Sequence, residues 1–151
     1  MRPQQSSRAT DAAARSAFRS DARAHATLAA LRARPPLKGK VTSGFGTRSS
    51  PRGKRFHAGI DIQARRGTPV RAPAAGTVIF AGWRNGYGKT IVVDHGDRLQ
   101  TRYAHLSKFS VRLGQTVQAG ATLGLTGATG HNSGPHLHYE VWEAERPVDP
   151  M

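Results

Sequence analysis

The spacing of apolar residues divides the sequence into a helical segment and a longer β-rich segment. From Thr10 to about Ala33 the chain is rich in Ala and Arg and contains no Gly or Pro, a composition that favours a helix. Apolar positions and one histidine recur at three- and four-residue steps and form a thin stripe: Ala14, Phe18, Ala22, His25, Leu28 and Leu31. Pro35 and Pro36 end the helix. Because large side chains are few, we expect the stripe, His25 included, to pack on the main domain, to pair with another helix, or to fray in isolation.

From Lys40 onward, short runs of β-forming residues alternate with Gly, Pro, Asn and Asp, which predicts an all-β domain. The predicted strands are Val41–Phe45, Thr77–Trp83, Thr90–His95, Leu99–Leu106, Thr122–Thr126 and Leu137–Trp142. The turn sequences Asn85–Gly88 and His95–Asp97 join consecutive strands, so we expect an antiparallel meander with long loops. The longest predicted loop, Thr47 to Arg55, is polar and basic.

These patterns predict a mainly β fold, an antiparallel sheet preceded by an N-terminal α-helical extension. The predicted boundary gives residues 1–36 to the Ala/Arg-rich helix with its Pro linker and residues 37–151 to one domain. No run of about 18 apolar residues exists, so we expect no membrane span. The first eight residues lack the apolar stretch of a secretory signal, so export is not predicted from this chain unless it is a mature or trimmed form.

Composition narrows the chemistry that such a domain can perform. Cysteine is absent, which excludes disulfides, thiolate nucleophiles and Cys-based zinc sites, so any metal must be held by His, Asp or Glu. The formal net charge of +14 favours anionic partners such as nucleic acid, acidic lipid or an acidic cell-wall polymer, and is equally compatible with a solvated basic surface.

Two short histidine motifs carry the candidate chemistry. In a strand, His136 and His138 share one face while Leu137 and Tyr139 occupy the other, and such a pair is either a half-exposed strand face or part of a metal site. His57 and Asp61 also lie on one face of an extended segment. Together with one histidine of the pair they supply three N/O ligands, the number typical of catalytic zinc, and leave the other histidine unliganded.

A third motif adds another imidazole. The alternating run Thr101 to Leu106 places Thr101, Tyr103 and His105 on one face. His105 and the unliganded histidine of the pair could take a proton from a metal-activated water and stabilise the oxyanion. No His-Glu-x-x-His helix is present, which excludes the helical zincin layout.

Seven motifs in a fixed order resemble one family, the LytM/lysostaphin-type zinc metallopeptidases that cleave bacterial peptidoglycan. The resemblance covers about Lys40 to Pro150. The motifs are Thr42-Ser43-Gly44-Phe45-Gly46-Thr47-Arg48, His57-Ala58-Gly59-Ile60-Asp61, Gly67-Thr68-Pro69-Val70 with Gly76-Thr77-Val78, Gly86-Tyr87-Gly88, Val93-Asp94-His95-Gly96, Tyr103-Ala104-His105-Leu106, and Gly134-Pro135-His136-Leu137-His138-Tyr139-Glu140.

This resemblance implies roles for particular residues. It makes His57, Asp61 and His138 the ligands of one zinc ion, and His105 and His136 the catalytic pair. It also implies a groove on the sheet, for which the Thr47–Arg55 and Thr129–Gly134 segments are the expected walls. The implied function is a zinc-dependent endopeptidase that hydrolyses peptide cross-links or bridges in peptidoglycan through a metal-activated water.

Other polar residues near these motifs receive simpler interpretations. His95 lies in a turn and is explained by local hydrogen bonding, whereas His131 lies in a loop close to His136 and could contact substrate at the rim. Glu140 shares the face of His136 and His138 and is either a partner that holds a ligand histidine or a solvated strand end.

Two rival functions compete with the enzyme. A non-catalytic regulator of the same family, which binds and activates another cell-wall hydrolase, typically lacks some ligands, whereas all five positions are filled here. A nucleic-acid binder would use interleaved basic and aromatic residues, and aromatic residues are sparse at 7%. The resemblance implies peptidoglycan peptide as substrate, anionic wall polymers as further partners, and a cell-envelope location. The peptide bond cleaved, the oligomeric state and the identity of the general base stay open.

Overall fold

The computed structural model describes residues 4–151, with side chains described from residue 8 onward. Residues 1–3, part of the stretch assessed for a secretory signal, lie outside the described residues. One helix, α1 (Gln4–Ala33), precedes a β domain. Its strands are β1 (Val41–Ser43), β2 (Gly46–Ser50), β3 (Gly53–His57), β4 (Ile60–Gln63), β5 (Pro69–Arg71), β6 (Gly76–Arg84), β7 (Gly88–Gly96), β8 (Leu99–Phe109), β9 (Thr116–Val117), β10 (Thr122–Thr126), β11 (His136–Glu143) and β12 (Arg146–Val148).

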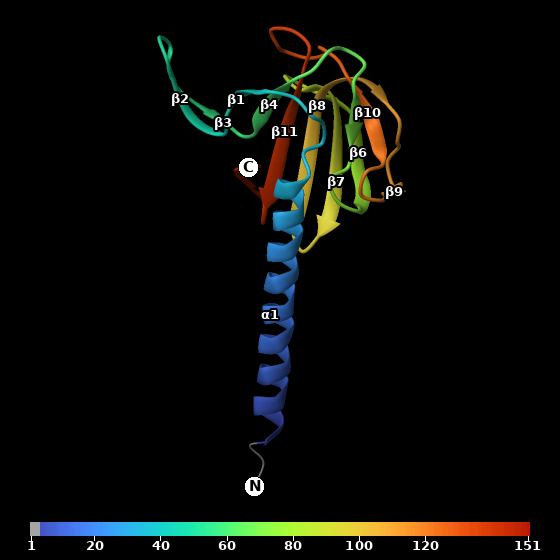
Figure 1. Cartoon of the computed structure of the whole chain (residues 1–151). Helices are drawn as coiled ribbons and strands as arrows, with labels where there is room; N and C mark the ends of the chain where they lie inside the picture. Colours follow the sequence, from blue (N-terminus) through green and yellow to red (C-terminus); the bar gives the residue numbers. More distant parts are fainter. Residues whose placement is uncertain (1–3) are drawn as a thin grey trace.

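Helix α1 projects from the β domain as a single long rod (Figure 1). Only its last turns pack on the domain, where Leu28 and Leu31 join the hydrophobic core. Phe18 is 75% exposed, and His25 is also exposed. The stripe therefore packs on the domain only at the C-terminal end of the helix. His25 does not pack on the domain, and its packing against another helix stays a prediction. The helix ends before Pro35, as predicted. Among the described residues, no helix combines the length and apolar character that crossing a membrane requires.

The main sheet is antiparallel, and its strands follow the order β1-β4-β11-β8-β7-β6-β9. Strand β10 pairs with β5 and β8, and β12 extends the sheet beside β11. The long strands β6, β7 and β8 form the predicted meander, and β11 lies between β8 and β4. The mainly β fold with an N-terminal helix is thus confirmed, and each of the predicted strands is present with ends that move by a few residues.

The segment Thr47–Arg55, predicted to be a loop, is instead a hairpin of β2 and β3 that projects from the sheet (Figure 1). Its residues are mostly exposed on both faces, so it lacks the alternation of apolar and polar residues that identifies a half-buried strand. The short strands β5, β9 and β12 were also not predicted, because two or three residues carry too little periodicity.

Strand alternation separates the core from a polar face at the centre of the sheet. On β11, Leu137 and Tyr139 are buried in the core, and Ile60 and Ile62 of β4 join them. Register pairs Leu137 with Ile62 and His138 with Asp61. The histidines of β11 and the aspartate of β4 therefore share the opposite face, as alternation predicts.

The docking of α1 on the domain leads to a stability prediction. Leu31 is 1% exposed, so Leu31→Ala should lower the free energy of unfolding by about 2 to 5 kcal/mol through lost burial and the cavity left behind. Phe18→Ala, in the projecting part of the same helix, is the matched control and should change it by less than about 0.5 kcal/mol. Urea unfolding of the full chain measures both. Equal effects of the two variants would contradict the docked position of the last helical turns.

Candidate metal centre

Three polar side chains, each carried by a different strand, converge on one point. His57 is the last residue of β3, Asp61 lies in β4, and His138 lies in β11 beside Asp61. Gly59 brings the first two against β11, because a Cβ atom at this position would collide with the carbonyl oxygen of Tyr139. A glycine is therefore required between His57 and Asp61.

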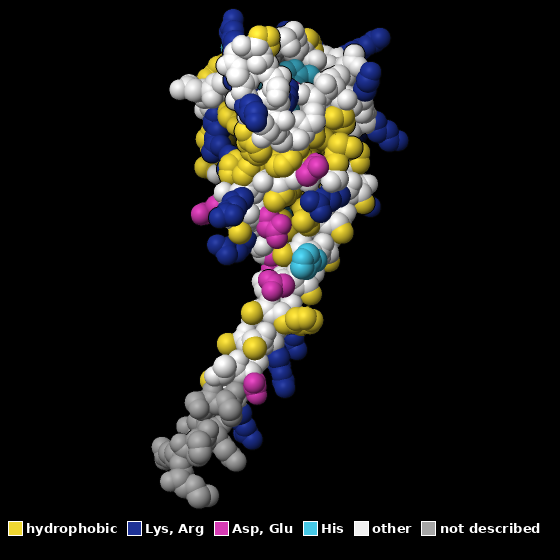
Figure 2. All heavy atoms as spheres, turned by 90° about the vertical axis from the view of Figure 1, so that its left-hand side faces the viewer, with side chains coloured by type: hydrophobic (Ala, Val, Ile, Leu, Met, Phe, Trp, Pro, Cys, Tyr) yellow, Lys and Arg dark blue, Asp and Glu magenta, His cyan; other side chains and the backbone are white. Residues whose placement is uncertain are grey.

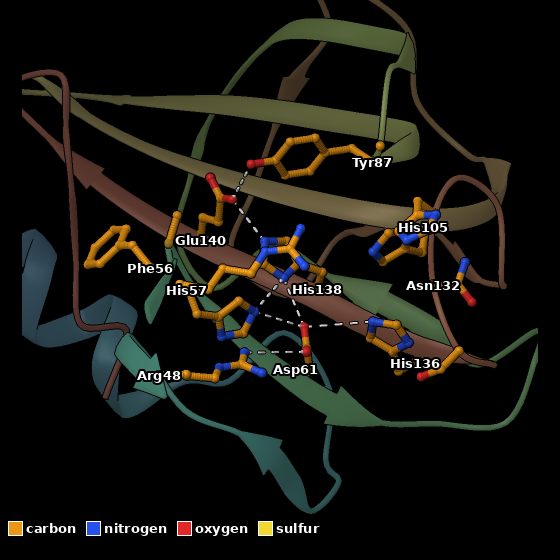
Figure 3. A pocket seen from close by; sticks show the side chains of 15 residues that line it. Arg48, Phe56, His57, Asp61, Tyr87, His105, Asn132, His136, His138 and Glu140 are labelled. Atoms are coloured by element: carbon orange, nitrogen blue, oxygen red, sulfur yellow. Dashed lines mark hydrogen bonds and ion pairs between the residues drawn. The ribbon is translucent and has the colours of Figure 1, made fainter. Parts of the chain in front are cut away.

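The nitrogen and oxygen atoms of these side chains lie close together (Figure 3). Asp61 Oδ1 is 2.8 Å from His138 Nδ1 and 3.4 Å from His57 Nε2, and the two nitrogens are 3.3 Å apart. Within the part of the chain that the structure describes, this is the group of His and acidic residues whose ligand atoms all lie within 4.8 Å of one another. Two imidazoles and one carboxylate form a donor set that suits zinc.

The second nitrogen of each imidazole has its own acceptor. His57 Nδ1 donates to the carbonyl oxygen of Gly44 at 2.8 Å, which leaves Nε2 as the nitrogen that faces Asp61. His138 Nε2 donates to Glu140 Oε1 at 2.8 Å, which leaves Nδ1 facing Asp61. Histidines that bind metals are usually oriented in this way, by a carbonyl or carboxylate at the other nitrogen. The residues present therefore fit a bound zinc ion.

The charges around His138 and Asp61 shift the pKa values of both side chains. Burial alone would lower the pKa of His138, but hydrogen bonds to Asp61 and Glu140 and their negative charges outweigh it and raise the pKa to about 9. Burial would also raise the pKa of Asp61, yet its contacts with His138, His57 and His136 lower it. A proton on His138 Nδ1 therefore faces Asp61, and a cation held there would displace that proton.

Glu140 lies beneath His138 and is fully buried. Tyr87 donates its hydroxyl to Oε1 at 3.0 Å, Trp142 Nε1 donates to Oε2, and an Arg102 nitrogen is 3.9 Å away. Burial raises the pKa of Glu140, but the hydrogen bonds from His138, Trp142 and Tyr87 lower it below its usual value. Glu140 therefore stays ionised and orients His138, so the partner interpretation is correct and the solvated strand end is wrong. Tyr87 and Trp142 were not singled out from the sequence.

His105 and His136 face the same centre from its other side (Figure 3). Their ring centroids are 4.8 Å apart, and His136 Nε2 is 3.7 Å from Asp61 Oδ1. His105 Nδ1 donates to Thr129 O at 2.7 Å, and His136 Nδ1 donates to Gly134 O at 2.8 Å. Both Nε2 atoms are therefore unprotonated when the rings are neutral. Burial lowers the pKa of His105, and electrostatic repulsion from the neighbouring His136 and His138 adds to this.

A β-bulge directs His105 to this face. Two steps along β7, from Lys89 to Ile91, pair with three steps along β8, from Leu106 to Tyr103. His105 has a φ of 60°, and its N–H donates to Tyr87 O at 2.8 Å. The predicted common face of Tyr103 and His105 is therefore wrong, because the extra residue reverses the alternation. Tyr103 is fully buried in the core and lies outside the cleft lining.

The five predicted site residues line one open cleft with a volume of about 400 Å³. One wall is the β2–β3 hairpin, which contributes Arg48, Arg55 and Phe56. The other wall comes from the segment before β11, with His131, Asn132 and Ser133. Both walls match the expected segments, although the first is a hairpin. Helix α1 contributes no residue to this lining and projects away from it (Figure 1), so its described part does not cover the cleft.

Two other histidines were given simpler interpretations. His95 lies in β7 and not in a turn, so the interpretation as a turn residue with local hydrogen bonds is only partly correct. His95 contacts Ala75 O at 2.8 Å and Thr101 Oγ1 at 2.7 Å, which are hydrogen bonds within the sheet and its turns. Its pKa is lowered by burial. His131 lines the cleft at its rim.

A comparison with family models identifies this architecture. The model described as peptidase family M23 matches residues 55–150. The chain belongs to peptidase family M23. The resemblance to LytM/lysostaphin-type metallopeptidases, predicted from the motifs, is confirmed by this match.

Curated M23 relatives share about four residues in ten with this chain. It is 43% identical over 119 residues to the DD-carboxypeptidase/endopeptidase Mpg of Neisseria meningitidis, which covers 78% of this chain and 27% of that protein. It is 41% identical over 117 residues to the peptidoglycan DD-endopeptidase ShyA of Vibrio cholerae, which covers 76% of this chain and 27% of that protein. The chain thus spans about a quarter of the length of these relatives.

A solved M23 structure has the same fold. The crystal structure of a zinc-containing peptidase from Vibrio cholerae matches with a TM-score of 0.74 and 40% identity, over 78% of this chain and 38% of that chain.

The buried carboxylate beneath His138 leads to a prediction about metal affinity. Glu140→Gln keeps the shape of the side chain but removes the charge that orients His138, so the zinc affinity should fall by roughly 10- to 100-fold. Glu143→Gln, at the end of the same strand, is the matched control and should bind zinc like the unaltered chain. Competition with a chromogenic chelator measures the dissociation constants. Equal zinc affinity of the two variants would show that Glu140 does not orient the ligand.

Proposed function

We propose that this chain is a zinc-dependent endopeptidase that hydrolyses peptide cross-links in bacterial peptidoglycan. The observation that carries the proposal is the cluster of His57, Asp61 and His138 in an M23 fold, with two further imidazoles at the same cleft. Residues 37–151 form the catalytic domain, which holds one zinc ion, and residues 1–36 form its helical extension.

In this proposal His57 Nε2, Asp61 and His138 Nδ1 hold the zinc, because these atoms converge while the other imidazole nitrogens are occupied by Gly44 O and Glu140. When bound, zinc supplies a Lewis acid that activates water and polarises the scissile carbonyl. Glu140 keeps His138 in the tautomer that presents Nδ1.

His105 and His136 handle the protons. Each ring is anchored at Nδ1 by a backbone carbonyl, so each Nε2 is fixed at the cleft as the atom that exchanges a proton. One histidine, in its neutral form, accepts the proton of the attacking water at Nε2. The other, protonated at both ring nitrogens, donates a hydrogen bond from Nε2 to the developing oxyanion. The two ring centroids are 4.8 Å apart, so one imidazole can contact the attacking water while the other contacts the carbonyl oxygen.

The substrate class follows from the relatives and from charge. ShyA is a peptidoglycan DD-endopeptidase and Mpg a DD-carboxypeptidase/endopeptidase, which favours a stem-peptide cross-link over a glycine bridge. Such a substrate places the protein in the cell envelope. In Figure 2 Lys and Arg side chains lie around the β domain and along the helix, whereas the few Asp and Glu side chains lie on the helix and on the part of the domain next to it. With a net charge of +14, this surface would attract anionic wall polymers.

The proposed activity predicts metal-dependent release of wall fragments. Incubation with purified peptidoglycan should release soluble peptides, a chelator should stop the release, and added zinc should restore it. Mass spectrometry of the fragments identifies the bond that is cut. If the zinc-loaded chain releases nothing from several wall types, the cleft is one that binds a partner hydrolase, and the endopeptidase proposal is wrong.

The division between ligands and catalytic residues predicts two different defects. His136→Ala should keep zinc bound but lower kcat by roughly 10²- to 10⁴-fold, because a proton-handling group is lost. His138→Ala should lose zinc together with activity. His25→Ala, an exposed histidine of α1, is the control and should affect neither. Metal content by atomic absorption and turnover of a synthetic cross-linked peptide measure both effects. Loss of zinc from His136→Ala would contradict the assigned roles.

A further inference from the structure

The β2–β3 hairpin forms a cationic wall beside the metal centre. Four cationic residues lie between Gly46 and His57, and the segment contains no acidic residue: Arg48, Arg52, Lys54 and Arg55. Arg48 and Arg55 line the cleft, whereas Arg52 and Lys54 do not. The wall across the cleft is made of His131, Asn132 and Ser133 and carries no acidic residue. An anion that enters this cleft therefore meets positive charge on one side only.

Arg48 and Arg55 are direct cross-strand neighbours in the hairpin. Like charges in this position destabilise a two-stranded pair, typically by a few tenths of a kcal/mol up to about 1 kcal/mol. The hairpin is mostly exposed and gains little burial that would offset this repulsion. An anion bound between the two guanidinium groups would turn this repulsion into attraction.

Neither arginine is neutralised by the protein. Arg55 has no hydrogen bond or ion pair to another described side chain, and Arg48 has only a 4.0 Å contact with Asp61 Oδ2 while 44% of its side chain is exposed. The other acid at the cleft, Glu140, is buried and already accepts hydrogen bonds from three side chains. The two guanidinium groups are therefore available to a ligand.

We propose that Arg48 and Arg55 bind a free carboxylate of the substrate peptide next to the scissile bond. The inference rests on the proposed function and names the chemistry of the peptide that this site selects. Arginine forks bind carboxylates in a bidentate manner, and the position of Arg48 beside Asp61 places the bound carboxylate within about one residue of the metal centre. The carboxylate comes either from the side chain of a diamino acid at the cross-link or from a chain terminus. A glycine bridge offers neither.

The test compares synthetic cross-linked peptides whose two carboxylates are amidated one at a time. The zinc-loaded chain should cleave the peptide with the recognised carboxylate roughly 10- to 100-fold more efficiently than its amide, mainly through KM. Arg55→Gln should lower kcat/KM for the acid peptide much more than for the amide, so that the preference is lost, and Arg55→Lys should keep part of it. Arg52→Gln, on the same hairpin but outside the cleft lining, is the matched control and should behave like the unaltered chain.

The outcomes separate this inference from the proposed function. Equal cleavage of the acid and amide peptides, or equal losses on both with Arg55→Gln, would overturn the carboxylate site and leave the endopeptidase intact. If neither peptide is cleaved, the endopeptidase proposal fails, and titration calorimetry with the same peptides still tests the site. Tighter binding of the acid than of the amide, lost in Arg55→Gln, would support it, and equal binding would overturn it. Whichever single amidation removes the preference identifies the source of the carboxylate.

Discussion

The pairing of β11 with β4 is the constraint on which the rest of the site depends. It places His138 opposite Asp61 on one face and Leu137 opposite Ile62 on the other, so the metal centre and the core are specified by the same register. A slip by one residue would put the histidines into the core and the leucine into the cleft. Burial of the apolar face therefore fixes the positions of the polar atoms. Gly59 completes this arrangement, because only a residue without a Cβ atom lets the His57–Asp61 segment lie against Tyr139.

The metal centre concentrates charge that the fold alone cannot neutralise well. Asp61 and the buried Glu140 flank His138, and a proton on that imidazole offsets only one of their two negative charges. A divalent cation brings more positive charge to the same point and satisfies His57 Nε2 as well. A cation held at this point would therefore stabilise the folded state, since the unfolded chain lacks the convergent side chains. Glu140 belongs to this charge balance as much as the ligands do.

The sequence predicted the features that follow from regular periodicity. The alternation along β11 placed His136 and His138 on the same face of the strand. The two prolines predicted that the helix ends near Ala33, which is its last residue. The prediction failed where a single residue interrupts the period. One extra residue in β8 places His105 on the opposite face from Tyr103. This bulge depends on the pairing with β7, so the local sequence does not predict it. The family resemblance assigned His105 correctly to the cleft because it did not depend on strand alternation.

The cleft is lined on one side by the main sheet and on the other by the β2–β3 hairpin. Asp61, His105, His136 and His138 come from the packed sheet, whereas the cationic wall is a two-stranded hairpin. At the base of this hairpin the rings of Phe45, just before β2, and Phe56 meet edge to face at 5.4 Å. The two parts are linked through His57, which ends β3 and also belongs to the metal centre. Its hydrogen bond to Gly44 O anchors the imidazole to the segment between β1 and β2, at the base of the hairpin. Because this anchor lies at the base of the hairpin, the position of the His57 imidazole does not depend on the charge or shape of the hairpin tip.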